Sequence, residues 1–183
     1  MKTSQCTEEV RDQISDVRSE KSDIRHQAPR VAMFQGSFDP FTRGHESIVR
    51  RALPLFDEIV VAVVSNIAKK PFMSLNNRLE FIKQIFADEP RVRVVASEGL
   101  TVDVAHEVGA TCLLRGVRMI QDFENEMHMA EINRRLGGIE TVLLYTLPEF
   151  SHISSTIVRE LYNYHQDASE YLPQGAPLSL LSK

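Results

Sequence analysis

Apolar runs alternate with helix-like stretches along most of this chain of 183 residues. The runs are rich in Val, Ile and Leu and lack apolar–polar alternation, so they predict strands that are covered on both faces. These predicted strands are 31–34, 59–64, 92–95, 112–114 and 141–145. Helices are expected at 44–56, 75–87, 101–108, 122–136 and 154–164. Such alternation predicts an α/β fold with a parallel sheet and right-handed crossovers.

The carboxyl ends of the predicted strands locate the candidate site, because ligands of open parallel sheets bind beyond those ends. The loops that matter are then the ones that begin near Gly36, Ser65, Ser97, Arg115 and Tyr145. Ser74 is expected to cap the helix over 75–87. Gly137 and Gly138 are expected to end the helix over 122–136, because glycine tolerates left-handed backbone angles.

The chain is expected to form one domain with two terminal segments. Residues 1–29 are rich in Ser, Asp, Glu, Arg and Gln and contain no Gly. This composition is typical of a disordered or weakly helical extension. Residues 30–173 hold the strand–helix pattern and form the predicted domain, and 174–183 form a C-terminal tail.

Composition and charge narrow the class of protein. Hydrophobic residues make up 43% and charged residues 25%, which is ordinary for a chain that buries a core. A formal net charge of −4 argues against a broad nucleic-acid-binding surface, although a few local cations can still hold a small anion. No membrane span or signal peptide is expected. Cys6 and Cys112 form no disulfide framework or zinc pattern, which fits a reducing cytoplasm.

The loop after the first predicted strand carries the strongest functional signal. It reads Gly36-Ser-Phe-Asp-Pro-Phe-Thr-Arg-Gly-His45 and leads into a helix, so it aims main-chain N–H groups and a helix dipole at an anion. Ser37 offers a hydroxyl and an N–H, and His45 can donate to a phosphate oxygen as a neutral or a cationic imidazole. The alternative is a tight turn in which Asp39 caps the helix and His45 is an ordinary surface residue. The whole loop favours nucleotide chemistry.

Cationic side chains follow two other strands. Lys69 suits phosphate neutralisation and a solvated basic pair equally well, whereas for Lys70 the solvated pair is preferred. Arg115 and Arg118 flank Gly116-Val117 directly after a buried strand, where packing does not explain them. Their guanidinium forks fit phosphate oxygens bidentately, so both are candidate phosphate ligands.

Two predicted helices begin with polar side chains near the same edge. Glu126 can accept from a ribose hydroxyl or orient an arginine, and the alternative is a solvated face with ion pairs. For Asp122, helix capping is at least as good an explanation. Ser154, Ser155 and Thr156 start the last helix, and Arg159 follows one turn later. Capping needs one hydroxyl, so three hydroxyls favour phosphate binding.

In combination, these motifs resemble the bacterial phosphopantetheine adenylyltransferases, which belong to the T/HxGH-type nucleotidyltransferases. The resemblance rests on the first loop, Arg-Gly-Val-Arg at 115–118, Asp-Phe-Glu-Asn-Glu at 122–126, Asn133-Arg134 and Ile-Ser-Ser-Thr-Ile-Val-Arg at 153–159. It extends from about Arg30 to Pro173. The first loop alone identifies only the superfamily, whereas all the motifs in this order and spacing are specific.

The resemblance implies a Rossmann-like, doubly wound parallel five-stranded sheet of the nucleotidyltransferase type. It also implies synthesis of dephospho-CoA and pyrophosphate from ATP and 4′-phosphopantetheine with Mg²⁺, in a cytoplasmic hexamer on which CoA can exert feedback. His45 would hold the α-phosphate and stabilise the transition state. The implied ATP contacts are Ser37, Phe38, His45, Gly116, Val117, Arg118, Glu126, Phe150, Ser151, His152, Ile153, Ser154, Ser155 and Thr156. The implied phosphopantetheine contacts are Ser37, Lys69, Thr101 and Arg115.

The chain departs from the common pattern of that family at four positions. Ser37 stands where threonine is usual and keeps the hydroxyl, and Gln35 replaces a frequent proline. Phe150 stands where tryptophan or another bulky residue is common, and His152 where an apolar or aromatic residue is usual. None of these changes removes a group that the chemistry needs.

The implied reaction needs no protein base, because the phosphate oxygen of the acceptor is already an anionic nucleophile. Cations and N–H donors that position the substrates and stabilise charge are therefore expected, without a nucleophile–base pair. Two alternatives stay open. One is a related nucleotidyltransferase with another phosphorylated acceptor, such as nicotinamide mononucleotide or glycerol 3-phosphate. The other is a non-catalytic regulator that binds a nucleotide or CoA on the same scaffold.

Overall fold

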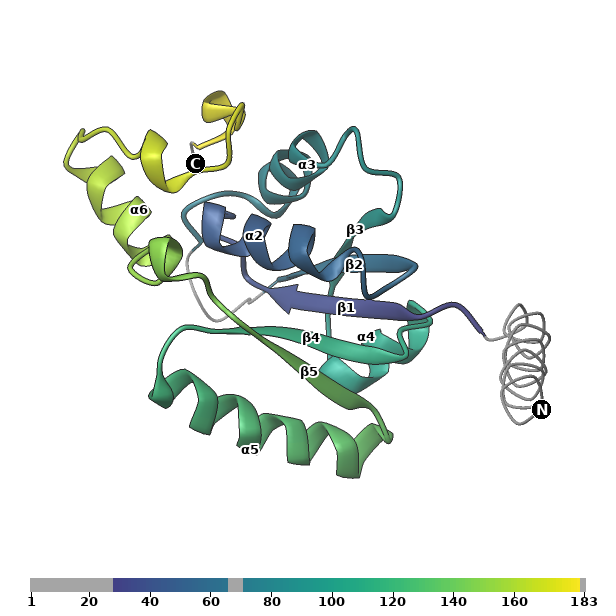
Figure 1. The fold of residues 1–183 in the computed structure, drawn as a ribbon. Helices are drawn as coiled ribbons and strands as arrows, with labels where there is room; N and C mark the ends of the chain where they lie inside the picture. Colours follow the sequence, from purple (N-terminus) through teal and green to yellow (C-terminus); the bar gives the residue numbers. More distant parts are fainter. Residues whose placement is uncertain (1–27, 66–70, 182–183) are drawn as a thin grey trace, which may run out of the picture.

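The computed structural model describes residues 28–65 and 71–181, which contain one sheet of five parallel strands. The strands are β1 (Val31–Gly36), β2 (Glu58–Val64), β3 (Val92–Ser97), β4 (Cys112–Val117) and β5 (Glu140–Tyr145). Their order in the sheet is β3-β2-β1-β4-β5, so the chain builds outward from β1 on one side and then returns to build on the other (Figure 1). This is the expected doubly wound topology, with its reversal between β1 and β4.

Helices cover both faces of this sheet. The helices are α2 (Arg43–Ala52), α3 (Leu75–Ile85), α4 (Thr101–Glu107), α5 (Ile120–Gly137) and α6 (Ser155–Asn163). Short 3₁₀ turns occur at η2 (Pro148–Phe150), η3 (Ser169–Tyr171) and η4 (Leu178–Leu180). In Figure 1, α2 and α3 lie on one side of the sheet, and α4 and α5 lie on the other.

Successive residues of the central strands supply two separate cores. Ala32 and Phe34 of β1 pack into the cluster under α2 and α3, whereas Met33 packs with Val102 and Ala105 of α4. This explains the unbroken apolar runs of β1, β2 and β4, whose two faces both meet helices. The expectation of full burial was wrong for β3 and β5. They are the edges of the sheet, and most of their residues are half-buried or exposed.

The helix ends follow local chemistry. The Ser74 hydroxyl accepts from the Asn77 N–H at 3.1 Å, so the predicted cap of α3 is confirmed. Gly138 ends α5 with a φ of +64°, as expected of a glycine at this position. The predicted helix over 44–56 was too long. It ends at Ala52 because Pro54, close behind it, has no N–H to continue the hydrogen-bond ladder.

The structure describes most of the C-terminal segment but little of the N-terminal one. Residues 1–27 lie outside the described residues, so the prediction for the N-terminal extension stays a prediction. The C-terminal tail packs on the domain as far as it is described, because Leu181 is buried in the core and the Leu180 carbonyl accepts from the Asn77 side chain of α3. Within the described residues, no helix is long and apolar enough to cross a membrane.

Candidate active site

A cleft of about 410 Å³ opens at the carboxyl ends of β1 and β4, where the strand order reverses. Its walls come from the loop after β1, the first turn of α2, the loop after β4, one face of α5 and the start of α6. In β1 and β4 the register pairs Phe34 with Leu114, and no pair follows it. The two strands therefore part at the cleft, and the residues that come next, Gln35 and Arg115, line it.

The loop after β1 is fixed by a buried aspartate. The Asp39 carboxylate accepts from the N–H groups of Phe72 and Met73 at 2.7 and 2.8 Å. The reading in which Asp39 caps the next helix was therefore wrong. Thr42 is the residue that precedes α2. Asp39 instead ties this loop to the segment that leads into α3.

His45 is held in one tautomer. The main-chain N–H of Thr42 donates to His45 Nδ1 at 3.0 Å, so the ring proton is on Nε2. The imidazole is surrounded by the rings of Phe34, Phe38 and Phe41, with centroids 6.2, 5.1 and 5.3 Å away. Nε2 has no hydrogen-bond partner among the described residues. It is therefore available as an N–H donor in the cleft that His45 lines.

The His45 imidazole is neutral at physiological pH. Burial, followed by the positive charges of Arg118 and Arg115, lowers its pKa from 6.5 to about 4. Sequence alone allowed either protonation state. The structure favours the neutral one, which keeps its donor without a change of charge across the neutral pH range.

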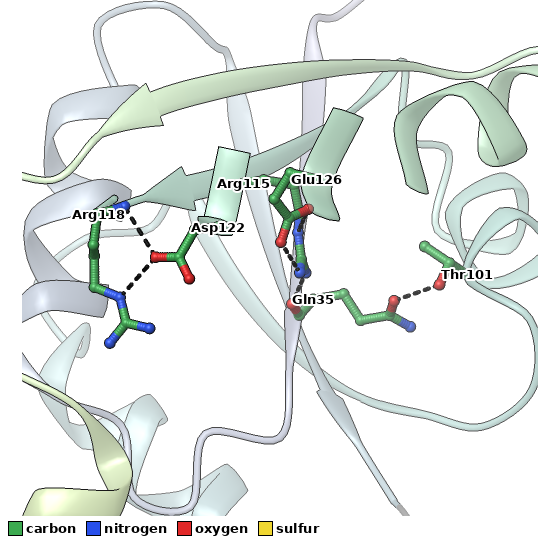
Figure 2. Close-up of polar contacts among 6 residues, drawn as sticks. All are labelled: Gln35, Thr101, Arg115, Arg118, Asp122 and Glu126. Carbon is green, nitrogen blue, oxygen red and sulfur yellow. Dashed lines mark hydrogen bonds and ion pairs between the residues drawn. The ribbon is translucent and has the colours of Figure 1, made fainter. Parts of the chain in front are cut away.

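Arg115 is oriented by two partners. Its Nε and NH2 groups donate to the two oxygens of Glu126 at 2.7 and 2.6 Å, and its NH1 donates to the Gln35 carbonyl at 2.8 Å (Figure 2). Of the two roles considered for Glu126, orienting an arginine is the one that this geometry supports. The bidentate pair fixes the guanidinium plane at the junction of β1 and β4.

Arg118 is fixed in a similar way on the other side of the cleft. Asp122 Oδ2 accepts from the main-chain N–H of Arg118 at 3.2 Å and from its Nε at 3.1 Å (Figure 2). Arg118 NH1 also donates to the Ile153 carbonyl at 3.4 Å, which connects the loop after β4 to the start of α6. The described residues that line the cleft include Arg115, Arg118 and Arg159, against the carboxylates of Asp122 and Glu126. The cleft therefore carries one more positive charge than negative, which favours anionic ligands.

The three hydroxyls before and in α6 have different partners. Ser154 is the cap, because its oxygen accepts from the Ile157 N–H at 3.2 Å. Ser155 donates to the Pro40 carbonyl at 2.8 Å, and Thr156 accepts from Arg159 at 3.0 Å. As expected, one hydroxyl suffices for capping. The protons of Ser154 and Thr156 remain available to a ligand, whereas the proton of Ser155 holds the first loop.

The sequence reasoning missed Arg78, a buried arginine of α3. Its NH1 donates to the carbonyls of Ser37 and Val64 at 2.7 and 2.9 Å, so it joins the loop after β1 to the end of β2. Arg78 is 4% exposed. A signal for it existed, because Arg78 precedes Phe81 and Ile82 by three and four residues and so lies on the buried face of α3.

A second cavity of about 150 Å³ lies behind Arg115, between the sheet, the start of α4 and one face of α5. Gln35, Arg115 and Glu126 line both the cleft and this cavity. Apolar side chains and a few polar groups form its walls: Met33, Thr101, Leu113, Met129, Ala130, Asn133 and Thr141. Asp122 and Glu126 line the cleft, whereas Glu126, Met129 and Asn133 line the second cavity, so side chains of α5 are divided between the two spaces.

Most of the candidate residues meet in the cleft. Those that line it are Ser37, Phe38, His45, Arg115, Gly116, Arg118, Glu126, Phe150, Ile153, Ser154, Ser155 and Thr156. Phe38 is 3% exposed, so it offers a ligand its main chain more than its ring. Thr101 lines the second cavity instead.

Three more of the described candidates are not brought into the cleft. Val117 is buried beneath a separate surface, next to Met119, Phe123 and Tyr145. Ser151 and His152 are exposed, and Ser151 donates to the Pro148 carbonyl while the His152 ring lies 6.0 Å from that of Tyr171. Lys69, like Lys70, lies outside the described residues.

The described part of the chain contains no group of three or more His, Cys, Asp or Glu side chains that could hold a metal ion. Asp122 and Glu126, the two carboxylates of the cleft, are both paired with arginines. A metal ion in this cleft would therefore take most of its ligands from a bound phosphate and from water, an arrangement usual for Mg²⁺.

Comparison with known proteins identifies what the chain is similar to. Residues 33–161 match the Cytidylyltransferase-like family. The chain is 45% identical over 150 residues to a phosphopantetheine adenylyltransferase of Bacteroides thetaiotaomicron, with 82% of this chain and 99% of the relative covered. It is 48% identical over 145 residues to one from Flavobacterium psychrophilum, with 79% and 96% covered.

A solved structure supports the fold independently. It is a bifunctional NMN adenylyltransferase/ADP ribose pyrophosphatase from Francisella tularensis, complexed with AMP and a manganese ion. The TM-score is 0.62 at 12% sequence identity, over 82% of this chain and 46% of that one. At this identity the likeness concerns the fold alone.

The depressed pKa of His45 predicts that acid destabilises the fold. Between pH 6.5 and 4 the unfolded chain binds a proton at this residue that the folded chain excludes, so stability falls as the pH falls through that window. A shift from 6.5 to about 4 corresponds to a loss of roughly 3 kcal/mol. Urea unfolding of the wild type and of His45→Gln at a series of pH values measures it. The stability of the wild type relative to the variant should fall across the window, and a difference that does not change with pH would contradict the assignment.

Proposed function

The chain belongs to the phosphopantetheine adenylyltransferases of the Cytidylyltransferase-like family, and on this premise we propose that it transfers the adenylyl group of ATP to 4′-phosphopantetheine. The products are dephospho-CoA and pyrophosphate, and the reaction belongs to coenzyme A biosynthesis. The observation that carries the proposal is the identity of 45 to 49% to curated phosphopantetheine adenylyltransferases over 95 to 99% of their lengths. The two neighbouring spaces, one at the strand reversal and one behind Arg115, both have Arg115 in their walls, which supports two substrates that meet at that arginine.

The chemistry is a displacement at phosphorus. A 4′-phosphate oxygen of the acceptor attacks the α-phosphorus of ATP, and the bond from that phosphorus to the oxygen that bridges to the β-phosphorus breaks. Pyrophosphate leaves with the bonding electrons. No proton has to move, so the protein has to place two anions in line and stabilise the charge that develops.

His45 supplies a donor for that charge. Its Nε2–H would donate to an α-phosphate oxygen, and Thr42 keeps the proton on that nitrogen by donating to Nδ1. A neutral donor held in place by the fold needs no rearrangement when the transition state forms, which is the basis of electrostatic preorganisation.

The arginines and hydroxyls would divide the two substrates between them. Arg115, at the junction of the spaces, would bind 4′-phosphopantetheine together with Ser37, Lys69 and Thr101, with Ser37 at its phosphate. Arg118 and the start of α6 would hold the triphosphate. We keep the whole of the ATP set inferred from the motifs as a proposal: Ser37, Phe38, His45, Gly116, Val117, Arg118, Glu126, Phe150, Ser151, His152, Ile153, Ser154, Ser155 and Thr156.

Mg²⁺ would enter with the nucleotide. The cleft fits a metal that is held by phosphate oxygens and water, because its two carboxylates are engaged by Arg115 and Arg118. When bound, the ion supplies charge neutralisation of the triphosphate.

The protein would work as a homo-oligomer in the cytoplasm, a hexamer by its resemblance to the family, with CoA as a possible feedback ligand in the same cleft. Large apolar side chains of α5 support an assembly. Ile120, Met127, Ile132 and Leu136 are 77%, 49%, 46% and 63% exposed on a helix of which only Asn133 is buried. Exposed apolar surface on this scale is typical of an interface between proteins.

His45→Ala tests the proposed chemistry. In an assay of pyrophosphate release from ATP and 4′-phosphopantetheine, turnover should fall about 10²- to 10³-fold, the usual cost of one donor to the developing charge. The affinity for ATP should change little. His128→Ala, which removes an exposed imidazole on α5, is the matched control and should keep full turnover. If the wild type released pyrophosphate with nicotinamide mononucleotide but not with 4′-phosphopantetheine, the proposed acceptor would be wrong. Unimpaired turnover of His45→Ala would refute the role of His45.

Arg115→Ala tests the division of the substrates. The loss of charge-assisted hydrogen bonds should raise the KM for 4′-phosphopantetheine about 10- to 100-fold. The KM for ATP should rise much less. Arg115→Lys keeps the charge without the bidentate fork and should lie between the wild type and the alanine variant. Equal rises for both substrates would count against the assignment.

Light scattering tests the assembly. The wild type should have a mass several times that of its 20.8 kDa chain. Charge placed on α5 by Ile120→Glu with Met127→Glu should lower it, because a buried unpaired carboxylate is costly. Leu55→Glu, at a residue 48% exposed after α2, is the control and should leave the mass unchanged. A wild type of single-chain mass would exclude the oligomer.

A further inference from the structure

Gln35 occupies the boundary between the two spaces and lines both of them. It lies in β1 just past the last residue that pairs with β4. Its main-chain carbonyl accepts from Arg115, and its side chain reaches the opposite way, to the corner between β3 and α4 (Figure 2). The main-chain contact depends on the strand and would survive a change of side chain, so the role of the carboxamide can be tested by itself.

The carboxamide has two partners at that corner. Oε1 accepts from the Thr101 hydroxyl at 2.7 Å, and Nε2 donates to the Ser97 hydroxyl at 2.9 Å. Ser97 is 1% exposed, whereas Thr101 is half-buried and lines the second cavity. A hydroxyl has one proton and two lone pairs. Because Thr101 gives its proton to Gln35, it can only accept hydrogen bonds from a molecule in the cavity.

We propose, on the basis of the function given above, that Gln35 is a positioning residue for 4′-phosphopantetheine. By taking the proton of Thr101, it leaves the Thr101 hydroxyl able only to accept a hydrogen bond, which an amide N–H of the bound substrate donates. An ionised phosphate has no proton to donate, so Thr101 does not bind the phosphate of the substrate. It binds the arm of 4′-phosphopantetheine, which carries amide N–H groups along its length.

The residues that line the second cavity fit an arm that contains both apolar segments and amide groups. Met33, Leu113 and Met129 give the cavity apolar walls. Thr101 and Asn133 add polar groups to the same lining. Such a lining suits a chain in which amide groups alternate with short aliphatic segments, because polar groups of the ligand can be paired while its apolar parts are buried.

Gln35→Met is the test, because methionine has a similar length and neither donor nor acceptor of comparable strength. Once freed, the Thr101 hydroxyl can turn and donate, so its preference for an N–H is lost. The KM for 4′-phosphopantetheine should rise about 3- to 10-fold, the worth of one neutral hydrogen bond. The kcat and the KM for ATP should stay within about twofold, since His45 and Arg115 keep their contacts.

Two further measurements separate positioning from a loosened fold. Acceptor analogues in which an ester oxygen replaces each amide N–H in turn should include one that the wild type uses about 3- to 10-fold less well. Gln35→Met should use that analogue and the natural acceptor about equally. Ser97→Ala removes the other partner of the carboxamide but leaves the Thr101 bond, so it should keep the discrimination of the wild type.

Several results would overturn the proposal: an unchanged KM for the acceptor in Gln35→Met, equal rises for both substrates, unaltered discrimination against the ester analogues, or loss of discrimination in Ser97→Ala. A wild-type enzyme that forms no product from 4′-phosphopantetheine would instead refute the proposed function. The two failures are therefore distinguishable.

Discussion

The adjacency of β1 and β4 is the constraint on which the site depends. These strands are far apart in the sequence, and their parallel register ends at Phe34 and Leu114. Beyond this pair the strands part, and the bond from Arg115 to the Gln35 carbonyl spans the opening. His45 at the start of α2, Arg115 and Arg118 at the end of β4, and the second cavity all lie around that opening. A sheet with the same strands in another order would separate these groups.

The charges of the cleft are fixed before any ligand arrives. Arg115 of β4 and Arg118 just after it each have an acidic partner on α5, and His45 is kept neutral by burial and by their positive charges. A lone buried cation would be costly, whereas a paired arginine keeps some N–H groups for a ligand at a lower penalty. The site thus offers oriented donors with a small net positive charge. This suits a reaction in which two anions must approach each other, because donors that are already oriented need no reorganisation.

The sequence was sufficient to predict the strands, the end of the sheet at which the site lies, and the loops that form the site. These follow from periodicity and from the chemistry of glycine, serine and arginine. It did not reveal how the side chains pair. Whether Glu126 meets a ribose or Arg115, and whether His45 carries a charge, depends on tertiary neighbours, as does the anchoring of Asp39 to Phe72 and Met73. The edge strands were taken as buried because an apolar run does not reveal its place in the sheet. Arg78 was overlooked because arginine is usually exposed, although its place on the buried face of α3 was readable.

In the proposed role, Gln35 would position two parts of the same substrate, the phosphate and the arm of the acceptor, without reacting with either. Its carbonyl orients the arginine that lies between the spaces, and its carboxamide sets the hydrogen-bonding sense of Thr101. The main-chain contact is independent of residue type, whereas the side-chain contact belongs to glutamine and cannot be made by proline. Reaction at the α-phosphorus requires the acceptor phosphate to sit at one fixed point, and an arm held at its amides limits where that phosphate can lie. The proposed recognition of the arm at Thr101 and the proposed placement of the phosphate at Arg115 would therefore be linked through a single strand end.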